Sequence, residues 1–268
     1  MLRGARPLKR WRYVAVFCDE LMACAAQVRI GPARQSFWAL YDRGSGELRE
    51  RTRMVPRAGE VTLVPARDGG TGAPPTAGRL RIADRGIVLD LALDEEPGVQ
   101  ALCDHGGAEV WTRKQAGIAA HGTLARDGGA PRPIAARAVV DDTSGHHARV
   151  TEWRWSAGVG EAADGRPVGW NLVSGVNDPA TGSERAVWVA GEPIEPGPVA
   201  FADDLSQIEG ADGSLLRFAP EAERARRDNL LIVRSSYRAP FGTFSGTLPG
   251  GVALARGSGV MEHHEARW

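Results

Sequence analysis

Hydrophobic side chains recur at every second position over most of this chain, in short runs that glycine and proline interrupt. Segments such as Trp11–Phe17, Gln35–Asp42, Gly86–Leu93 and Leu230–Tyr237 follow this period of two, which is typical of β-strands. The spacing of three and four residues that marks an amphipathic helix is scarce, and the short segment Pro220–Arg227 is the one place where we expect a helix. The pattern therefore predicts an all-β protein of about sixteen short strands.

The segment Gly128–Pro133, which reads GGAPRP, divides the predicted strands about evenly. Closing a sheet into a barrel removes its exposed edges, so many short antiparallel strands are commonly arranged in barrels. We therefore expect two β-barrel halves, residues 1–130 and residues 131–268. No long linker separates them, so we expect them to pack closely.

Residues 141–160, which read DDTSGHHARVTEWRWSAGVG, hold more chemically capable side chains than any other stretch of the chain. On a strand, alternate residues share a face, which places His147, Arg149, Trp153 and Trp155 together. Aromatic surface with a few polar groups is typical of a pocket that encloses an apolar ligand. The alternative is a packed tryptophan core in which Arg149 pairs with an acid for structural reasons.

Two further strands carry candidate ligand-binding residues. Trp170 and Asn171 are adjacent and therefore point to opposite faces, and an inward-facing Asn171 needs a hydrogen-bonding partner. The segment YRAPFGTFSGT, residues 237–247, alternates aromatic and small side chains, so Tyr237, Phe241 and Phe244 are candidate walls of a pocket.

The end of the chain offers a carboxylate–imidazole pair. Glu262 and His264 lie two residues apart and share a strand face, which suits proton transfer. A metal site is the weaker interpretation, because His263 and His264 point in opposite directions and no third ligand is obvious. We expect this segment to be ordered, with Trp268 docked against the protein, and we predict no metal. The usual nucleotide and cofactor motifs are absent, so we predict no cofactor.

The charge balance gives no reason to expect nucleic acid or an anionic membrane as a partner, because Lys plus Arg and Asp plus Glu both total 33. No apolar run is long enough for an integral membrane segment. Cys18, Cys24 and Cys103 are odd in number and lack metal-site spacing, which favours reduced thiols. Together these features predict a cytoplasmic protein.

Several stretches resemble a bacterial family catalogued as domain of unknown function 2804. They read KRWRYVAVFCDELM, DDTSGHHARVTEWRWSAG, GWNLVSGVND, APFGTFSGTL and GVMEHHEARW, and they occur in the family's order over nearly the whole chain. His146 departs from the pattern, because this position more often carries an aromatic residue in the family. If that residue touches the ligand, specificity differs in this protein.

The resemblance implies a fold distantly similar to the lipocalin-like double-barrel proteins that include carotenoid hydratases and certain terpene or tocopherol cyclases. It implies two closely packed, calycin-like antiparallel β-barrels with a pocket for an apolar small molecule, such as a lipid or an isoprenoid. It assigns no activity, because none is assigned to the family.

The first functional hypothesis is a cofactor-independent hydratase, isomerase or cyclase that uses acid chemistry in an apolar pocket. Its candidate proton-transfer residues are Asp142, His147, Glu262 and His264. Its candidate ligand-binding residues are Arg149, Trp153, Trp155, Asn171, Tyr237, Phe241 and Phe244. A carrier or sensor of a hydrophobic molecule would use the same pocket without turnover. A structural protein without a ligand is the third alternative, and the sequence leaves the oligomeric state open.

Overall fold

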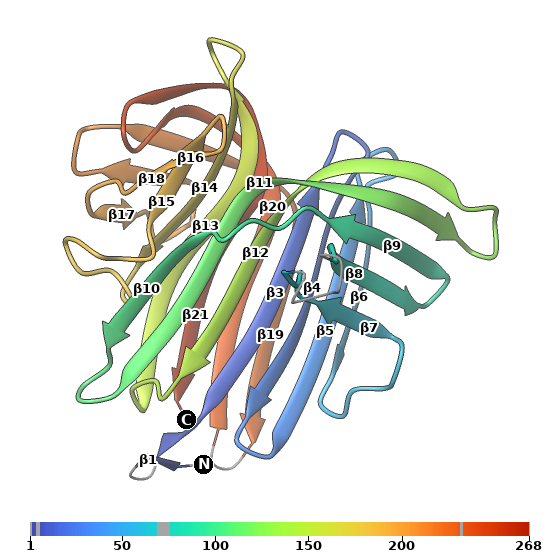
Figure 1. Ribbon diagram of the computed structural model, residues 1–268, viewed down its shortest axis with the longest axis horizontal. Coiled ribbons are helices and arrows are strands. Elements are labelled where there is room, and N and C mark those ends of the chain that lie inside the picture. Colours follow the sequence, from blue (N-terminus) through green and yellow to red (C-terminus); the bar gives the residue numbers. More distant parts are fainter. Residues whose placement is uncertain (1, 4–5, 69–75, 231–232, 268) are drawn as a thin grey trace.

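The structure is a computed structural model that describes residues 2–3, 6–68, 76–230 and 233–267. Within these residues every regular element is a β-strand, and the prediction of an all-β protein is confirmed. The strands form two large antiparallel sheets and a small ribbon near the N-terminus (Figure 1). The ribbon pairs β1 (Leu2–Arg3) with β2 (Arg6–Pro7).

The first sheet has ten strands, in the spatial order β6-β5-β4-β3-β12-β11-β9-β8-β7, with β10 also paired to β11. β7 packs against β4, where the side-chain amide of Gln27 donates to the carbonyl oxygen of Val61, so the sheet curls back on itself. Its strands are β3 (Lys9–Phe17), β4 (Leu21–Ile30), β5 (Ala33–Asp42), β6 (Glu47–Arg53), β7 (Val61–Val64), β8 (Gly78–Asp84), β9 (Ile87–Leu93), β10 (Val99–Asp104), β11 (Glu109–Arg126) and β12 (Arg132–Gly145).

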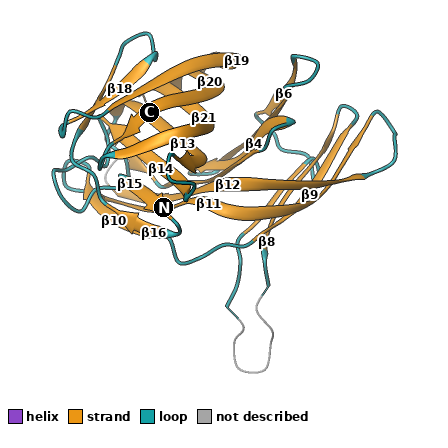
Figure 2. Cartoon of the chain, turned by 90° about the horizontal axis from the view of Figure 1, so that it is seen from above, coloured by secondary structure: helices purple, strands orange, loops and turns teal. Residues whose placement is uncertain are grey.

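The second sheet has nine strands, in the spatial order β16-β15-β14-β13-β21-β20-β19-β18-β17, and it curls so that β17 packs against β14. Seen from above, the two sheets form two curled halves side by side (Figure 2). The strands of the second sheet are β13 (Val150–Ala162), β14 (Pro167–Ser174), β15 (Ala186–Val189), β16 (Glu192–Ile194), β17 (Val199–Phe201), β18 (Gln207–Gly210), β19 (Leu215–Leu230), β20 (Val233–Leu248) and β21 (Val252–Arg267).

Two local predictions need correction. The chain passes from the first sheet to the second between Gly145 and Val150 and not at residue 130, because β12 pairs with both β3 and β11. The GGAPRP segment forms most of the turn between β11 and β12 and the first two residues of β12. In this turn Asp127 and Gly128 adopt positive φ. The predicted helix Pro220–Arg227 is part of β19, where the pairing with β20 shifts register at Pro220; a bulge accommodates the residue that lacks an N–H donor.

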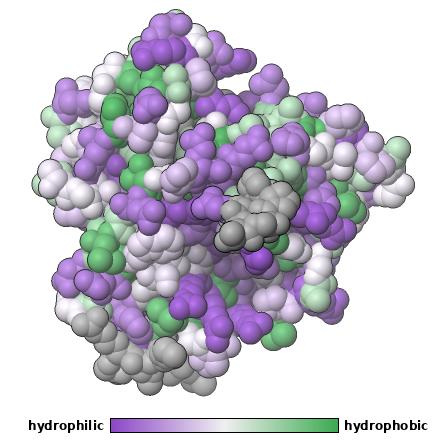
Figure 3. Space-filling model, in the orientation of Figure 1, coloured by the Kyte–Doolittle hydropathy of each residue, from purple (hydrophilic) through white to green (hydrophobic). Residues whose placement is uncertain are grey.

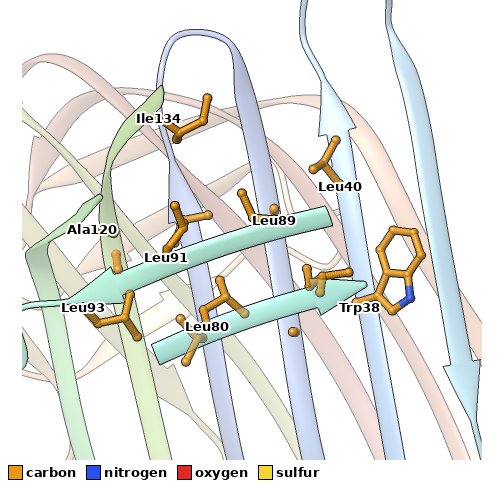
Figure 4. Close-up of a cluster of buried hydrophobic side chains, with 14 of the residues drawn as sticks. Trp38, Leu40, Leu80, Leu89, Leu91, Leu93, Ala120 and Ile134 are labelled. Carbon is orange, nitrogen blue, oxygen red and sulfur yellow. The ribbon is translucent and has the colours of Figure 1, made fainter. Parts of the chain in front are cut away.

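Buried side chains form three clusters that explain the alternation in the sequence. Each half-barrel has its own interior, which in the first half is built of aliphatic residues from β8, β9, β11 and β12 together with Trp38 and Leu40 (Figure 4). The third cluster lies between the two sheets. In β3, Val14 and Val16 point into the first half-barrel, while Ala15 and Phe17 point toward the second sheet. The central strands are therefore apolar on both faces, and polar side chains there must be satisfied by other protein groups or by a ligand.

Gly158 allows a tight contact in the second half-barrel. A Cβ atom at this position would lie 2.3 Å from Cζ2 of the fully buried Trp170 and 2.6 Å from the carbonyl oxygen of Ser258. We expect Gly158→Val to lower the free energy of unfolding by about 1–3 kcal/mol, the usual effect of overpacking. Chemical denaturation measures this change, with the exposed Glu152→Val on the same strand as control, and equal stability of the two variants would contradict the packing argument.

Candidate functional site

A cavity of about 200 Å³ lies between the two sheets. Its walls are residues on the faces that the two sheets turn toward each other. They come from β3, β4, β5, β11 and β12 of the first sheet and from β13, β14, β19, β20 and β21 of the second (Figure 1). An engineered cavity of about 150 Å³ binds benzene, so this space suits a compound of about one ring, or part of a larger one. Most of the lining is apolar, with a few polar groups from both sheets.

Glu262 is the acid on the cavity wall formed by β21. The indole Nε1–H of Trp153, on the paired strand β13, donates a hydrogen bond of 2.8 Å to its Oε1. Burial raises the pKa of Glu262 to about 7, although the hydrogen bond from Trp153 favours the charged form. Within the described chain no lysine or arginine lies within ion-pair distance of this carboxyl group. Near neutral pH, a large fraction of Glu262 therefore carries a proton.

His264 lies two residues further along the same face of β21. Its Nε2 is hydrogen-bonded to Ser235 Oγ at 2.8 Å, and its Nδ1 lies 3.8 Å from Glu262 Oε1. Burial lowers the pKa of His264 to about 3, so the imidazole is neutral. The ring centroid of Trp153 lies 4.2 Å from that of His264. Glu262 and His264 share a face, as strand alternation predicts, but desolvation outweighs their mutual attraction and both favour the neutral form.

A network of buried polar side chains around Lys114, the Lys114 network, forms a second wall of the cavity and joins the two halves. Lys114 Nζ lies 2.7 Å from Asp141 Oδ1 and 3.3 Å from Glu184 Oε1. The side-chain amide of Asn177 donates to Glu184 at 2.9 Å, and its oxygen lies 2.8 Å from His105 Nε2. Burial alone would lower the pKa of Lys114, but the two carboxylates outweigh it and raise that pKa. Lys114 is therefore a permanent buried cation.

His147 lies beside the Lys114 network and is 3% exposed. Its ring centroid lies 4.9 Å from that of Trp11 and 5.1 Å from that of His105. Burial lowers the pKa of His147 to about 3, and within the described structure its Nδ1 has no hydrogen-bonding partner. A neutral imidazole with an unused ring nitrogen at a cavity wall is suited to bind an oxygen or nitrogen atom of a ligand.

Arg224 is the second buried cation of the cavity. Its guanidinium carbon lies 4.3 Å from the ring centroid of Phe37. It donates hydrogen bonds to Glu50, at 2.7 Å, and to the hydroxyl oxygen of Tyr237, at 2.8 Å. Since Glu50 and Phe37 belong to the first sheet and Arg224 to the second, this residue also holds the two halves together.

Most of the predicted site residues line the cavity. Trp155 is buried and Trp153 half-buried, and both face the same side as His147. The predicted residues that line the cavity are His147, Trp153, Trp155, Tyr237, Phe241, Glu262 and His264. Trp268 lies outside the described residues, while β21 continues to Arg267.

Asp142 and Arg149 lie elsewhere. Asp142 points to the opposite face of the first sheet and binds Arg12 and Arg113, so its neighbour Asp141 is the aspartate that faces the cavity. Arg149 is exposed just before β13 begins. His146, the departure from the family pattern, is hydrogen-bonded to the Arg6 carbonyl and does not line the cavity.

Asn171 and Phe244 are buried without lining the cavity. Asn171 accepts a hydrogen bond from the Trp155 indole and donates one to the Glu184 carbonyl, so protein groups satisfy it. Phe244 packs against Trp170 and Phe218 inside the second half-barrel. Phe241 and Phe244 are three residues apart on one strand, which places them on opposite faces.

Sequence reasoning missed Lys114, Asp141, Glu184 and Arg224 as cavity residues. One signal was available, because Lys114 is one of two lysines and lies in β11 two residues before the run of small and apolar residues 116–120. The three cysteines form no disulfide, and the described chain contains no helix long and apolar enough to cross a membrane.

One group of side chains on the outer surface has the geometry to hold a metal ion. Glu152, His263 and Glu265 each offer one oxygen or nitrogen atom, and these atoms lie within 4.8 Å of one another on the face opposite His264.

Solved structures with the same arrangement were found at low sequence identity. An AttH-like protein from Nitrosomonas europaea is 14% identical over 98% of this chain and 93% of its own, with a TM-score of 0.56. Kievitone hydratase from Nectria haematococca is 12% identical over 95% of this chain and 88% of its own, with a TM-score of 0.58. CghA in a structure with Sch210972 is 9% identical over 98% and 88%, with a TM-score of 0.51. The predicted fold, two lipocalin-like antiparallel half-barrels, is confirmed.

No curated protein matches this chain by sequence. The model of one family, described as "Domain of unknown function (DUF2804)", matches residues 80–268. The chain belongs to this family, as the sequence motifs predicted.

Proposed function

Since membership of this family assigns no activity, we propose a function from the cavity itself: acid-promoted addition of water to an unsaturated apolar small molecule, or its rearrangement, with Glu262 as the proton donor. The observation that carries the proposal is the position of the Glu262 carboxyl group in a mainly apolar cavity, where burial raises its pKa to about 7. A general acid is most effective when its pKa lies near the working pH. Glu262 meets this condition because burial disfavours its charged form.

In the proposed reaction, Glu262 transfers its proton to a carbon–carbon double bond, and the ligand becomes a carbocation. The aromatic rings of Trp153, Tyr13 and Tyr237 belong to the cavity lining and would stabilise this positive charge. The Trp153 Nε1–H stabilises the carboxylate that remains, because it already donates to Oε1. A water molecule then bonds to the cation and returns a proton to Glu262, directly or through His264, so that one water is added overall. If the cation instead loses a proton from carbon, the product is an isomer.

The polar wall would orient the ligand. His147 has a ring nitrogen without a hydrogen-bonding partner among the described residues, and it lies beside the Lys114 network. It belongs to the side of the cavity that is formed by the first sheet. An oxygen atom of the ligand would hydrogen-bond there and so fix which carbon faces Glu262. The name of one structural neighbour, a hydratase, agrees with water addition, but at 12% identity it supports the fold alone.

A carrier or sensor of the same ligand is the second candidate. The observation that favours it is that His264 Nε2 and Lys114 Nζ are both bound by other protein groups, as in a rigid binding site that performs no chemistry. The two candidates differ only in whether the bound ligand changes.

The experiment begins with native mass spectrometry of protein purified from its own host, followed by extraction of any bound molecule. That molecule and a panel of ring-bearing alkenes are then incubated with the protein in ¹⁸O-labelled water and in D₂O. Hydration incorporates one solvent oxygen and one carbon-bound deuterium, whereas isomerisation incorporates deuterium alone. Binding without incorporation of either label would overturn the enzymatic proposal and favour a carrier.

A further inference from the structure

A groove of about 870 Å³ lies on the opposite face of the first sheet, at the open end of the first half-barrel. Its arginines point away from the cavity, because strand alternation directs Arg10 and Arg12 of β3 to one face and Tyr13 to the other. Trp11, Val28 and Gln35 line both spaces. Hydrophilic side chains cover much of the face seen in Figure 3. Five arginines line the groove, in a chain whose net charge is zero.

Three of these arginines stand in one row across adjacent strands. Arg10 of β3 is the direct register partner of Arg29 of β4, and Arg29 is the direct partner of Arg34 of β5. All three are exposed and line the groove. Neighbouring strands are about 4.8 Å apart, so the row spans about 10 Å. Like charges placed directly opposite each other destabilise a sheet.

The row lacks acids to compensate this charge. Asp142 is the one carboxylate among the described residues that line the groove, and it binds Arg12 and Arg113 in the next row. The buried Glu95 binds the same two arginines, which leaves that row neutral. Within the described part of the chain, Arg10, Arg29 and Arg34 have no carboxylate within ion-pair distance.

The next row, which contains Arg12, adds a hydrogen-bond donor without a partner among the described residues. The Nε atom of Arg12 is buried and has no hydrogen-bonding partner among the described residues. Trp111, whose indole donates to Gln100 at 2.9 Å, forms part of the opposite rim. The groove thus combines three uncompensated planar cations, an unused N–H donor and an aromatic edge.

We propose that this groove binds a small phosphorylated molecule, with Arg10, Arg29 and Arg34 holding a phosphate or diphosphate group. Guanidinium groups match phosphate oxygens with pairs of parallel hydrogen bonds. A row of three guanidinium groups is longer than a single carboxylate group. Its length fits two linked phosphate groups better. The bound anion removes the repulsion along the row, and this role is independent of the chemistry proposed for Glu262.

The test is calorimetric titration of the full chain with sodium pyrophosphate at constant ionic strength. We expect saturable binding that is tighter than the binding of orthophosphate. Arg29→Gln, at the centre of the row, should weaken pyrophosphate binding about tenfold, a typical effect of losing one charge-assisted contact. The control Arg256→Gln removes an exposed arginine of the second sheet and should leave binding unchanged.

A second measurement does not depend on the ligand. Without phosphate, Arg29→Gln should raise the melting temperature at low salt, and the gain should fade at high salt as the repulsion is screened. Sedimentation with phosphatidylcholine vesicles, with and without phosphatidic acid, identifies the source of the phosphate group: binding to the acidic vesicles indicates a lipid and its absence a free ester. Unsaturable pyrophosphate binding, or equal affinity of Arg29→Gln and the unaltered protein, would overturn the proposal.

Discussion

Glu262→Gln should reduce turnover at pH 7 by about a hundred- to ten-thousand-fold, the usual contribution of a general acid. Glutamine keeps the shape of the side chain and can still accept the hydrogen bond from Trp153, so ligand binding should be nearly unchanged. In the unaltered protein the rate should fall as the pH rises through about 7, because the active form of Glu262 is the protonated one. The measurement is the single-turnover rate against pH with the ligand identified by extraction.

Glu223→Gln is the matched control for this variant. Glu223 lies on the same sheet, where it pairs with Arg238 at the surface, and its replacement should leave the rate unchanged. If Glu262→Gln retains more than about a tenth of the rate, another group donates the proton and the proposed role of Glu262 is wrong.

Lys114→Met should lower the free energy of unfolding at pH 7 by about 3–5 kcal/mol, since it leaves buried carboxylates without their cation. Asp141 and Glu184 both bind Lys114 and are both almost fully buried. Burial already raises the pKa of Glu184, and losing the lysine should raise it further. Protonation then removes the repulsion, so the loss should be smaller at pH 5 than at pH 7.

Chemical denaturation at the two pH values measures this effect. Adding Glu184→Gln to Lys114→Met should recover part of the stability, because only one buried carboxylate then remains uncompensated. Arg256→Met at the surface serves as control and should change stability by less than about 0.5 kcal/mol. A loss below 1 kcal/mol for Lys114→Met, or one that is equal at both pH values, would contradict a buried charge network.

The period of two and the glycine and proline turns predicted the all-β fold, because alternation is a local property of a strand. The same local rule placed Trp153, Trp155, Glu262 and His264 on cavity-facing sides. It could not show which of Asp141 and Asp142 faces the cavity, since this depends on pairing with β3 and β11. The bulge at Pro220 also hid a strand, and with it Arg224, behind a segment that resembles a short helix.

The polar wall of the cavity could not be found from the sequence, because its members are distant along the chain. Lys114 and Asp141 come together through the pairing of β11 with β12, while Glu184 reaches them from the other sheet. The ionisation of Glu262 depends in the same way on burial by both sheets, which spacing along β21 does not reveal. The motif at the end of the chain therefore predicted that Glu262 and His264 share a face, but not their protonation states.

The most direct test of the account is a titration of the Glu262 side-chain carboxyl carbon by ¹³C NMR, with Glu262→Gln used to assign the signal. We expect a pKa of about 7 for Glu262, because burial outweighs the hydrogen bond from Trp153. In the unfolded chain this group titrates near 4.5, so the protein should lose stability as the pH rises from 4.5 through 7, and Glu262→Gln should remove that loss. A pKa between about 4 and 5 would show a carboxylate that is ionised at neutral pH, and would contradict its role as the acid.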